Sequence, residues 1–324
     1  MKKLLLSLAM SIFGIMGMSA QEEQVATLVS GDNSTPFYGT EALVEAYAAA
    51  QNGDVITLSA GIFTAVDIEK AITLRGVGMR PTDNNGATIT RLGGFTVNIP
   101  ESAGTEVTLE DLKIEGDLSI NGKDLVPVNL NRCYFGSPAG KVYGDYSEGG
   151  SRSVNLSGVY AKLVHCIMCY LNQSNSKAYL QSCYAYEVSG QVTMDNCNIH
   201  EPRGFENSVA RNCIFSYWGN FKISNTNSVT YCICNGNGGA SIFTDINSTT
   251  NKIVEFTWPT ATYQQTFVLP EEVATNYLGD DGTQVGMLGG TNPFTDKSSN
   301  PQVKKLAVKS SAENGVLKVK IDVE

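Results

Sequence analysis

Hydrophobic residues recur along this chain in a short window that alternates, breaks once and then resumes. The window reads φ-x-φ-x-x-C-x-φ, where φ is apolar and x is mostly polar or small. The complete windows are 128–135, 178–185 and 192–199. Three partial windows keep the cysteine and the apolar residue two positions later, and their cysteines are Cys166, Cys213 and Cys232. Ser208 and Asn227 break the first apolar position in the last two of these.

The same alternation continues upstream with other residues at the cysteine position, in the windows 56–63, 72–79, 87–94 and 107–114. The cysteine positions and their equivalents are residues 61, 77, 92, 112, 133, 166, 183, 197, 213 and 232. Neighbouring positions lie 14 to 21 residues apart, except across an insertion from Ser137 to Arg152 that is rich in Gly and Tyr. About ten repeats of this kind therefore make up most of the chain.

The window predicts a strand, a sharp two-residue bend and a second strand. Alternation with period two places the φ positions on one face, and the interruption returns the next apolar residue to the same face. A single such turn cannot bury its apolar face, so turns must stack with their strands in parallel. The spacing never settles at the 3.6 residues of a helix. We therefore expect an all-β parallel solenoid of about ten coils; the alternative is a β-sandwich, whose strands alternate in direction.

Cysteine usage supports the stacked arrangement. Eight cysteines in an exported protein ordinarily suggest disulfides. Six of them occupy the same position of successive windows, where neighbours in a parallel sheet are about 4.8 Å apart, whereas bonded Cβ atoms lie at about 3.5–4.5 Å. We expect a ladder of buried, reduced cysteines. Cys166 and Cys169 have the spacing of zinc ligands, but no second pair has it, so no metal site is expected.

Both ends of the repeat array have features that favour caps. Good helix formers from Thr40 to Gln51 predict a helix with Thr40 as its N-cap, which would cover the first coil. Gly53 and Asp54 then lead into the first strand. Alternating residues 306–309 and 316–323 flank Glu313-Asn314-Gly315 and predict a terminal hairpin. The Gly-rich segment 281–290 is expected to close the array before that hairpin.

The first twenty residues have the pattern of a signal peptide. Lys2 and Lys3 precede an apolar run from Leu4 to Met18, and Ser19-Ala20 leads into a polar segment. A membrane anchor is the alternative, but spanning takes about 20 apolar residues. We expect residues 1–20 to be removed, 21–278 to form the solenoid with its N-terminal cap, and 279–324 to form the closing segment and hairpin. The mature protein would then be periplasmic, cell-surface or extracellular, with no membrane span.

Charge narrows the choice of partner. The chain has a formal net charge of −9, and loss of Lys2 and Lys3 makes the mature protein −11. Nucleic acids and anionic membranes are bound by clustered Lys and Arg, and no basic run is present. Nucleic acid is therefore not an expected partner.

A family resemblance rests on three segments. The run from Ala49 to Phe63 resembles the opening of pectate-lyase-like proteins, and Ile72 to Gly76 looks like their next coil. The segment 281–290 with Asn292-Pro293-Phe294 is similar to the end of uncharacterised secreted β-helix proteins of gut bacteria. The resemblance implies a right-handed parallel β-helix and a polysaccharide or cell-surface glycan as partner. It does not imply an activity, because function resides in the site.

The catalytic motifs of that family are missing. The Arg-x-Pro-x-x-Arg pattern of the pectate lyases, which also use calcium, does not occur, and neither do the Gly-His-Gly and Arg-Ile-Lys tripeptides of polygalacturonase-like relatives. The best local cluster is His200, Glu201, Arg203, Glu206 and Arg211. Within it a carboxylate would raise the pKa of the His200 imidazole, and Arg203 would hold a uronate. The alternative for this cluster is a loop of solvated ion pairs. Asp280-Asp281 is interpreted as a polar loop.

Outward aromatic residues suggest a different site. Tyr179, Tyr184, Tyr186 and Trp218 alternate with inward positions or lie on neighbouring coils, and such rings can stack on sugars. The alternative is that loops pack over them. Two functions follow: a non-catalytic glycan-binding or scaffold protein, favoured by the missing motifs, or a divergent polysaccharide lyase or glycoside hydrolase. No cofactor is expected, and calcium enters only under the lyase alternative.

Overall fold

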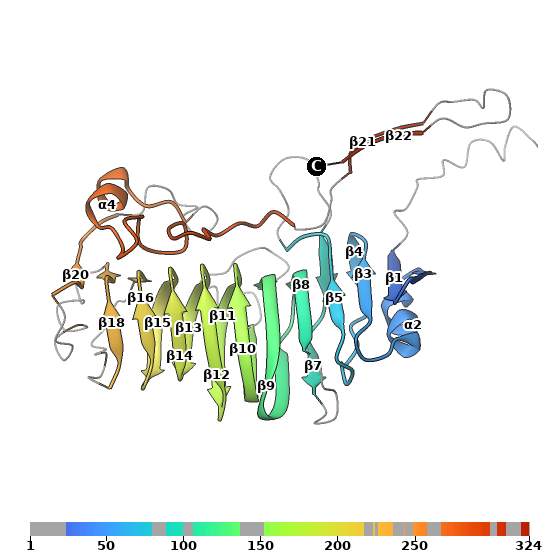
Figure 1. Ribbon diagram of the computed structural model, residues 1–324, viewed down its shortest axis with the longest axis horizontal. Coiled ribbons are helices and arrows are strands. Elements are labelled where there is room, and N and C mark those ends of the chain that lie inside the picture. Colours follow the sequence, from blue (N-terminus) through green and yellow to red (C-terminus); the bar gives the residue numbers. More distant parts are fainter. Residues whose placement is uncertain are drawn as a thin grey trace, which may run out of the picture.

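The protein is all-β, and its strands form one long, mostly parallel assembly that does not close into a barrel (Figure 1). The computed structural model describes residues 24–79, 89–99, 106–136, 152–216, 223, 226–235, 243, 249–257 and 267–298, together with the backbone of 303–308 and 319–323. The predicted signal peptide and most of the insertion 137–152 lie outside these residues. The assembly is compatible with a β-helix-like solenoid.

Three stacks of parallel strands run along the assembly. The first stack holds β3 (Val55–Leu58), β5 (Thr73–Arg75), β8 (Val107–Ile114), β9 (Leu118–Phe135), β10 (Ser153–Val164), β12 (Lys177–Gln181), β14 (Val192–Asp195), β16 (Val209–Arg211) and β18 (Ser228–Thr230). The second joins β4 (Gly61–Phe63), β6 (Thr90–Leu92), the ends of β8 and β9, β11 (Ile167–Ser174), β13 (Tyr184–Gly190), β15 (Asn198–Phe205), β17 (Ile214–Phe215), β19 (Ile233–Cys234) and β20 (Lys252–Ile253). The third contains β7 (Phe95–Asn98), the starts of β9 and β10, and the ends of β11, β13 and β15.

A sharp bend joins the first stack to the second, as the window predicted. The residue before each inward anchor has a left-handed backbone, with φ between 48° and 57°; these residues are Asp111, Arg132, His165, Ser182, Asn196, Asn212 and Tyr231. One left-handed residue turns the chain and returns the next side chain to the interior. Asn and Asp tolerate this conformation best, so three of the seven bends have a residue suited to them. His165 lies in such a bend, as expected.

Two of the predicted windows belong to one turn rather than two. Both β5 and β6 pair with β8, so the positions around Val77 and Leu92 are parts of the same coil. Thr90, not Leu92, holds the cysteine position of this coil, because Leu92 pairs with Ile114 and Leu112 pairs with Cys133. The Thr90 Oγ1 accepts a hydrogen bond from Val77 N at 3.0 Å and donates to Ser59 O at 2.8 Å. The sequence placed the windows separately because the chain makes an excursion between β5 and β6.

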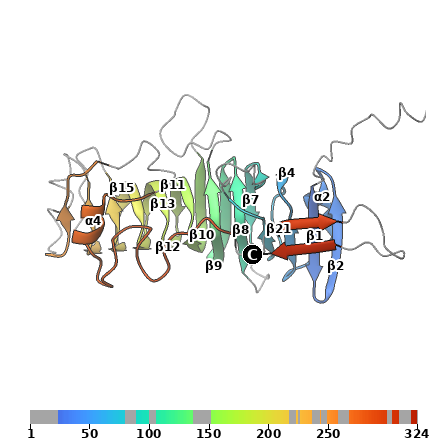
Figure 2. The ribbon, with the colours of Figure 1, turned by 90° about the horizontal axis from the view of Figure 1, so that it is seen from above.

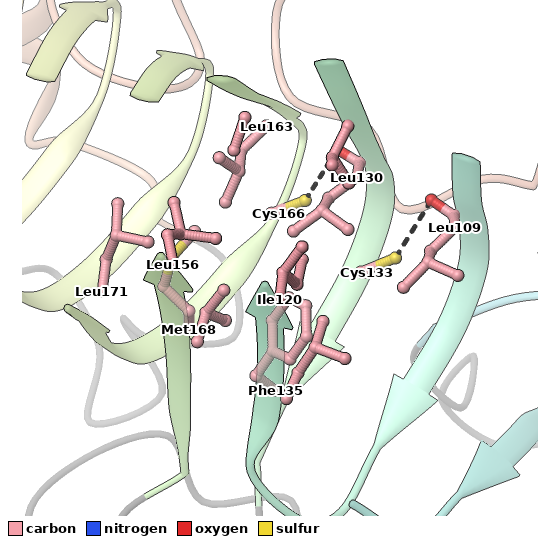
Figure 3. Packing of buried hydrophobic residues seen from close by; sticks show 14 of the residues in the cluster. Leu109, Ile120, Leu130, Cys133, Phe135, Leu156, Leu163, Cys166, Met168 and Leu171 are labelled. Carbon is pink, nitrogen blue, oxygen red and sulfur yellow. Dashed lines mark hydrogen bonds between the residues drawn. The ribbon is translucent and has the colours of Figure 1, made fainter. Parts of the chain in front are cut away.

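The cysteine ladder is confirmed in the packing. All eight cysteines are free, and the six ladder cysteines have no exposed surface. Several sulfurs lie close to a carbonyl of the preceding turn: Cys133 Sγ is 3.4 Å from Leu109 O, and Cys166 Sγ is 3.2 Å from Leu130 O (Figure 3). The thiols thus fill space between Leu, Ile and Phe side chains while donating weakly to the backbone.

At some repeated positions a polar residue stands where the sequence pattern has a cysteine or an apolar residue, and its side chain bonds the backbone of a neighbouring turn. Asn251 occupies the next cysteine position, where its Oδ1 accepts from Cys232 N at 3.0 Å and its Nδ2 donates to Val229 O at 2.8 Å. Ser208 and Asn227 do the same at another bend: Ser208 N donates to Asn227 Oδ1 at 2.8 Å. A polar side chain replaces an apolar one there because it satisfies a buried backbone group.

Thiol titration tests the ladder directly. We expect no more than one thiol, Cys169, to react readily in the native protein, because it is half-buried whereas the other seven are buried. Burial also raises the pKa of the Cys169 and Cys197 thiols and lowers their thiolate fraction. All eight should react in denaturant without a reductant. Three or more disulfides found by mass spectrometry would contradict both the ladder and its register.

The N-terminal region differs from the prediction. Before the first predicted strand, β1 (Val25–Ser30) and β2 (Asn33–Tyr38) form an antiparallel hairpin, and β1 also pairs antiparallel with β3. The helix α2 (Ala42–Ala49) packs against these strands. Its N-cap is Glu41 and no side chain caps it, so the assignment of Thr40 is wrong. Thr40 instead accepts a backbone hydrogen bond from Thr64.

The C-terminal segment runs back along the assembly instead of closing its far end (Figures 1 and 2). After α4 (Glu271–Asn276), residues 279–298 form an extended strap over the bends. The strap meets earlier turns in reverse order: Gly286 N bonds Asn212 O, Asn292 O accepts from Ser182 Oγ, and Ser298 Oγ donates to the Asp111 carboxylate. The predicted hairpin exists as β21 (Val303–Val308) and β22 (Val319–Val323), which pair antiparallel in a separate two-stranded sheet.

A second apolar cluster lies between the stacks and this returning chain. Tyr134, Ile167 and Tyr184 point outward from the main core but are at most 3% exposed. Phe267 and Met287 cover them, with the Tyr184 and Phe267 ring centroids 5.2 Å apart. The expectation that Tyr184 faces solvent is therefore wrong, because a distant segment packs over it.

Candidate ligand-binding site

The predicted catalytic residues lie inside a strand rather than after one. His200, Glu201 and Arg203 all belong to β15, which continues to Phe205. The His200 side chain is therefore held against the sheet and the residue is only 9% exposed. These side chains therefore belong to a strand and not to a loop between strands, since the third stack extends β15 beyond Ile199.

The pKa of His200 also moves opposite to the prediction. Burial lowers its pKa below the ordinary value, and the neighbouring Glu201 charge offsets this only in part. Desolvation disfavours the imidazolium more strongly than one partly buried carboxylate favours it. His200 is thus a neutral ring at pH 7, packed within an aromatic stack.

The carboxylates of this face form an ion-pair cluster. Arg203 Nη2 is 2.7 Å from Glu201 Oε2, and Arg203 Nε is 3.6 Å from Glu187 Oε2. The Arg203 side chain is 63% exposed. Burial raises the pKa of Glu187, against the opposing charge of Arg203. The arrangement matches the alternative of a solvated ion-pair cluster more closely than a catalytic pair facing a substrate.

Aromatic rings on the same face pack against one another. Tyr186 stacks on His200 at 4.8 Å between centroids, and Tyr170 meets it edge-on at 5.9 Å. These contacts use ring surface of Tyr186 that a sugar would need for stacking. Trp218 lies outside the described residues. Among the predicted aromatic residues that the structure describes, Tyr179 lines a pocket.

That pocket lies between the first stack and the strap. It encloses about 290 Å³, near the lower end of small-ligand sites at about 300–1,000 Å³. Its lining is polar and consists of Tyr179, Gln181, Ser182, Asp195, Asn196, Arg211, Asp280, Asp281, Gly290, Thr291 and Asn292. Parallel register aligns Gln181, Asp195 and Arg211 on adjacent strands. We call this cavity the strap pocket.

Hydrogen bonds fix the side chains that come from the strands. Tyr179 Oη donates to Asp195 Oδ2 at 3.0 Å, and Arg211 Nε donates to Asp195 Oδ1 at 2.9 Å. Burial and the Asp195 charge both raise the pKa of Tyr179. The phenol therefore stays protonated at neutral pH and acts as a donor. Arg211 Nη1 also reaches Asp280 Oδ2 at 3.4 Å, which links strand and strap.

The strap side of the pocket is fixed by its own bonds. Asn212 and Asp280 exchange two hydrogen bonds, from Asn212 Nδ2 to Asp280 Oδ1 at 2.8 Å and from Asp280 N to Asn212 Oδ1 at 3.0 Å. Asp281 Oδ1 accepts from Thr283 N at 2.9 Å and from Thr283 Oγ1 at 2.8 Å. Gly290 N donates to Thr283 Oγ1 at 2.6 Å. The wall is thus preorganised.

One lining group has no hydrogen-bond partner among the residues that the structure describes. Asn196 is 7% exposed, and within the described residues its Nδ2 finds no acceptor. A Cβ at Gly290 would lie 2.9 Å from Asn196 Oδ1, and Gly290 has φ +82°, so glycine is required for this close approach. Buried donors are nearly always satisfied. An acceptor atom of a ligand in the strap pocket would satisfy this one.

Sequence reasoning found only part of this site. It singled out Tyr179 and noted Asp280-Asp281 as a polar loop, but it did not connect them. It grouped Arg211 with His200, whereas the structure places Arg211 in this pocket. Asp195 looks like an ordinary exposed strand residue in the sequence. The repeat register, which aligns positions 181, 195 and 211, was the signal available for the strand side of the site.

The described residues were also considered as a metal site and as a membrane span, and the whole chain was compared with known proteins. In the described part of the chain, no group of three or more His, Cys, Asp or Glu side chains is arranged to hold a metal ion. No helix among the same residues is long and apolar enough to cross a membrane. Compared with known proteins, the chain matches no protein-family model and none of the curated proteins.

Proposed function

We propose that this protein is an exported, non-catalytic glycan-binding or scaffold protein that works in polysaccharide use at or outside the cell surface. Its fold in this proposal is a right-handed parallel β-helix of the pectate-lyase-like kind, with about ten coils and with α2 as the N-terminal cap. The parallel stacks, the cysteine ladder and the packing of α2 on β1 and β3 support that fold.

The strap pocket carries the functional proposal. Its lining supplies hydroxyl, amide, carboxylate and guanidinium groups, and the buried Asn196 Nδ2 lacks a partner. A sugar presents hydroxyl and ring-oxygen atoms at close spacing, which such a lining can bind through several short hydrogen bonds. The rigid strap wall reduces the entropy lost on binding.

The state of the carboxylates supports binding without cleavage. Asp195 accepts from Tyr179 and Arg211, Asp280 accepts from Asn212, and Asp281 accepts from Thr283. Hydrogen bonds within the protein engage all three carboxylates, whereas a general acid or base must reach the substrate atom with which it exchanges a proton. His200, the other candidate, is buried on β15 and does not line this pocket.

Filling the pocket tests the proposal. Thr291 is exposed and lines the strap pocket, so Thr291→Trp should occupy the cavity while leaving the hydrogen bonds above intact. We expect the wild type to bind at least one member of a soluble polysaccharide panel in titration calorimetry. The variant should lose affinity for it by about tenfold or more, equivalent to ~1.4 kcal/mol.

The matched control is Thr275→Trp on α4, an exposed threonine outside the lining, which should bind like the wild type. Equal binding by wild type and Thr291→Trp would contradict the strap pocket as the site. Release of cleavage products from the panel by the wild type would favour the lyase or hydrolase alternative instead.

A further inference from the structure

The strap pocket has an excess of negative charge. Three carboxylates line it, those of Asp195, Asp280 and Asp281, against one guanidinium, that of Arg211. Arg211 is already shared between Asp195 at 2.9 Å and Asp280 at 3.4 Å. The lining therefore carries a formal charge of −2. Lys162 pairs in register with Tyr179 on the neighbouring strand but is not part of the lining.

This charge selects among sugars. A uronate would place a further carboxylate beside three others, and the one arginine is already engaged. A protonated amine would be attracted by the carboxylates and would not have to displace an existing ion pair. A bare metal ion is disfavoured, since the described residues hold no group of three or more metal-ligating side chains. The pocket thus fits an organic cation that also carries hydroxyl groups.

The buried Asn196 amide favours a ligand that also has a hydrogen-bond acceptor beside its positive charge. Asn196 lines the pocket, is 7% exposed and has an Nδ2 without an acceptor among the described residues. A hydroxyl or ring oxygen next to the amine would provide it. Resting on the proposed glycan-binding function, we propose that the strap pocket binds an amine-bearing sugar of the glucosamine kind and discriminates against uronic acids.

Three trisaccharides of equal length test the inference by titration calorimetry. They are the trimers of glucosamine, of N-acetylglucosamine and of galacturonic acid, compared at pH 6, between the usual pKa ranges of aspartic acid and amines. We expect the glucosamine trimer to bind at least about tenfold more tightly than its N-acetylated form, because acetylation removes the charge. The galacturonate trimer should bind most weakly. Added salt should weaken the first interaction most.

One substitution removes a negative charge from the pocket lining and keeps the hydrogen bonds that hold the strap. Asp281→Asn keeps an Oδ1 that can accept from Thr283, so the strap should stay in place. It should reduce the preference for glucosamine over N-acetylglucosamine by about threefold or more. Glu272→Gln on α4 is the matched control, since it removes one exposed carboxylate outside the lining and should leave the preference unchanged.

The possible outcomes distinguish a failure of the amino-sugar inference from a failure of the proposed glycan-binding function. Equal or tighter binding of the galacturonate or N-acetylated trimer, lost in Thr291→Trp, would overturn the amino-sugar inference while supporting glycan binding at the pocket. Glucosamine binding that Thr291→Trp and Asp281→Asn leave unchanged would place the amine elsewhere and also overturn it. Absence of binding by all three trimers and by the whole polysaccharide panel would overturn both.

Discussion

A chain that ends before Phe267 is expected to associate in solution and to lose several kcal/mol of stability. Truncation there removes Phe267, Met287 and the rest of the strap, and so exposes Tyr134, Ile167 and Tyr184, which are at most 3% exposed in the full chain. Each large side chain returned to water costs about 1.5–3 kcal/mol. The newly exposed apolar patch favours association. Thermal unfolding and light scattering measure the two effects.

A second truncation, after Ser298, is the control. It removes β21 and β22 but keeps the strap and the hydrogen bond from Ser298 Oγ to the Asp111 carboxylate. We expect this protein to remain monomeric if the full chain is, and to unfold near the temperature of the full chain. If the chain that ends before Phe267 is as stable and as dispersed as the full chain, the strap does not seal the second apolar cluster.

Arg132→Asn is expected to destabilise the protein by about 3–5 kcal/mol. The Asp111 side chain is fully buried, and Arg132 Nε reaches its Oδ1 at 2.7 Å. Arg132 also pairs with Glu110, which Arg75 holds at 2.8 Å. Burial opposes the charge of Arg132, but Asp111 and Glu110 more than offset this and raise its pKa. The substitution leaves Asp111 with a buried negative charge and without its main counter-ion.

The choice of asparagine isolates the electrostatic effect. Residue 132 has a left-handed backbone with φ 48°, and asparagine tolerates that conformation well, so the bend itself should not be strained. Arg211→Asn is the comparison, because the Arg211 side chain is 49% exposed and its ion pairs should contribute only about 0–1 kcal/mol. Urea denaturation of both variants gives the free energies of unfolding. Similar losses in the two would contradict the proposed importance of the buried cluster.

The repeating strands and bends could be predicted from sequence because their cause is local. Two residues of the same strand face the same side whenever they are two apart, and one left-handed residue resets the alternation, so the windows around Cys133 and Cys197 identify inward positions without any knowledge of distant segments. Where that local signal is weak, the repeat was either misplaced, at residue 92, or not predicted, at residue 251. Asn251 holds a cysteine position with a polar side chain, and Thr90 does the same after an excursion of the chain.

What covers the outward positions was decided only by the tertiary structure. Tyr179, Tyr184 and Tyr186 have the same outward alternation in the sequence, yet the first lines a pocket, the second is sealed under Phe267, and the third stacks on His200. Alternation determines which face of a strand a side chain takes, because that depends on its neighbours in the chain. The Tyr186 ring meets His200 of the next coil. Whether the face meets the strap depends on a segment about 70 to 110 residues away, as in the Arg211–Asp280 and Ser182–Asn292 contacts, and loop closure over such distances leaves little local signal. For the same reason the sequence predicted the coils, and the fold alone brought Asp280 and Asp281 to Asp195 and Arg211.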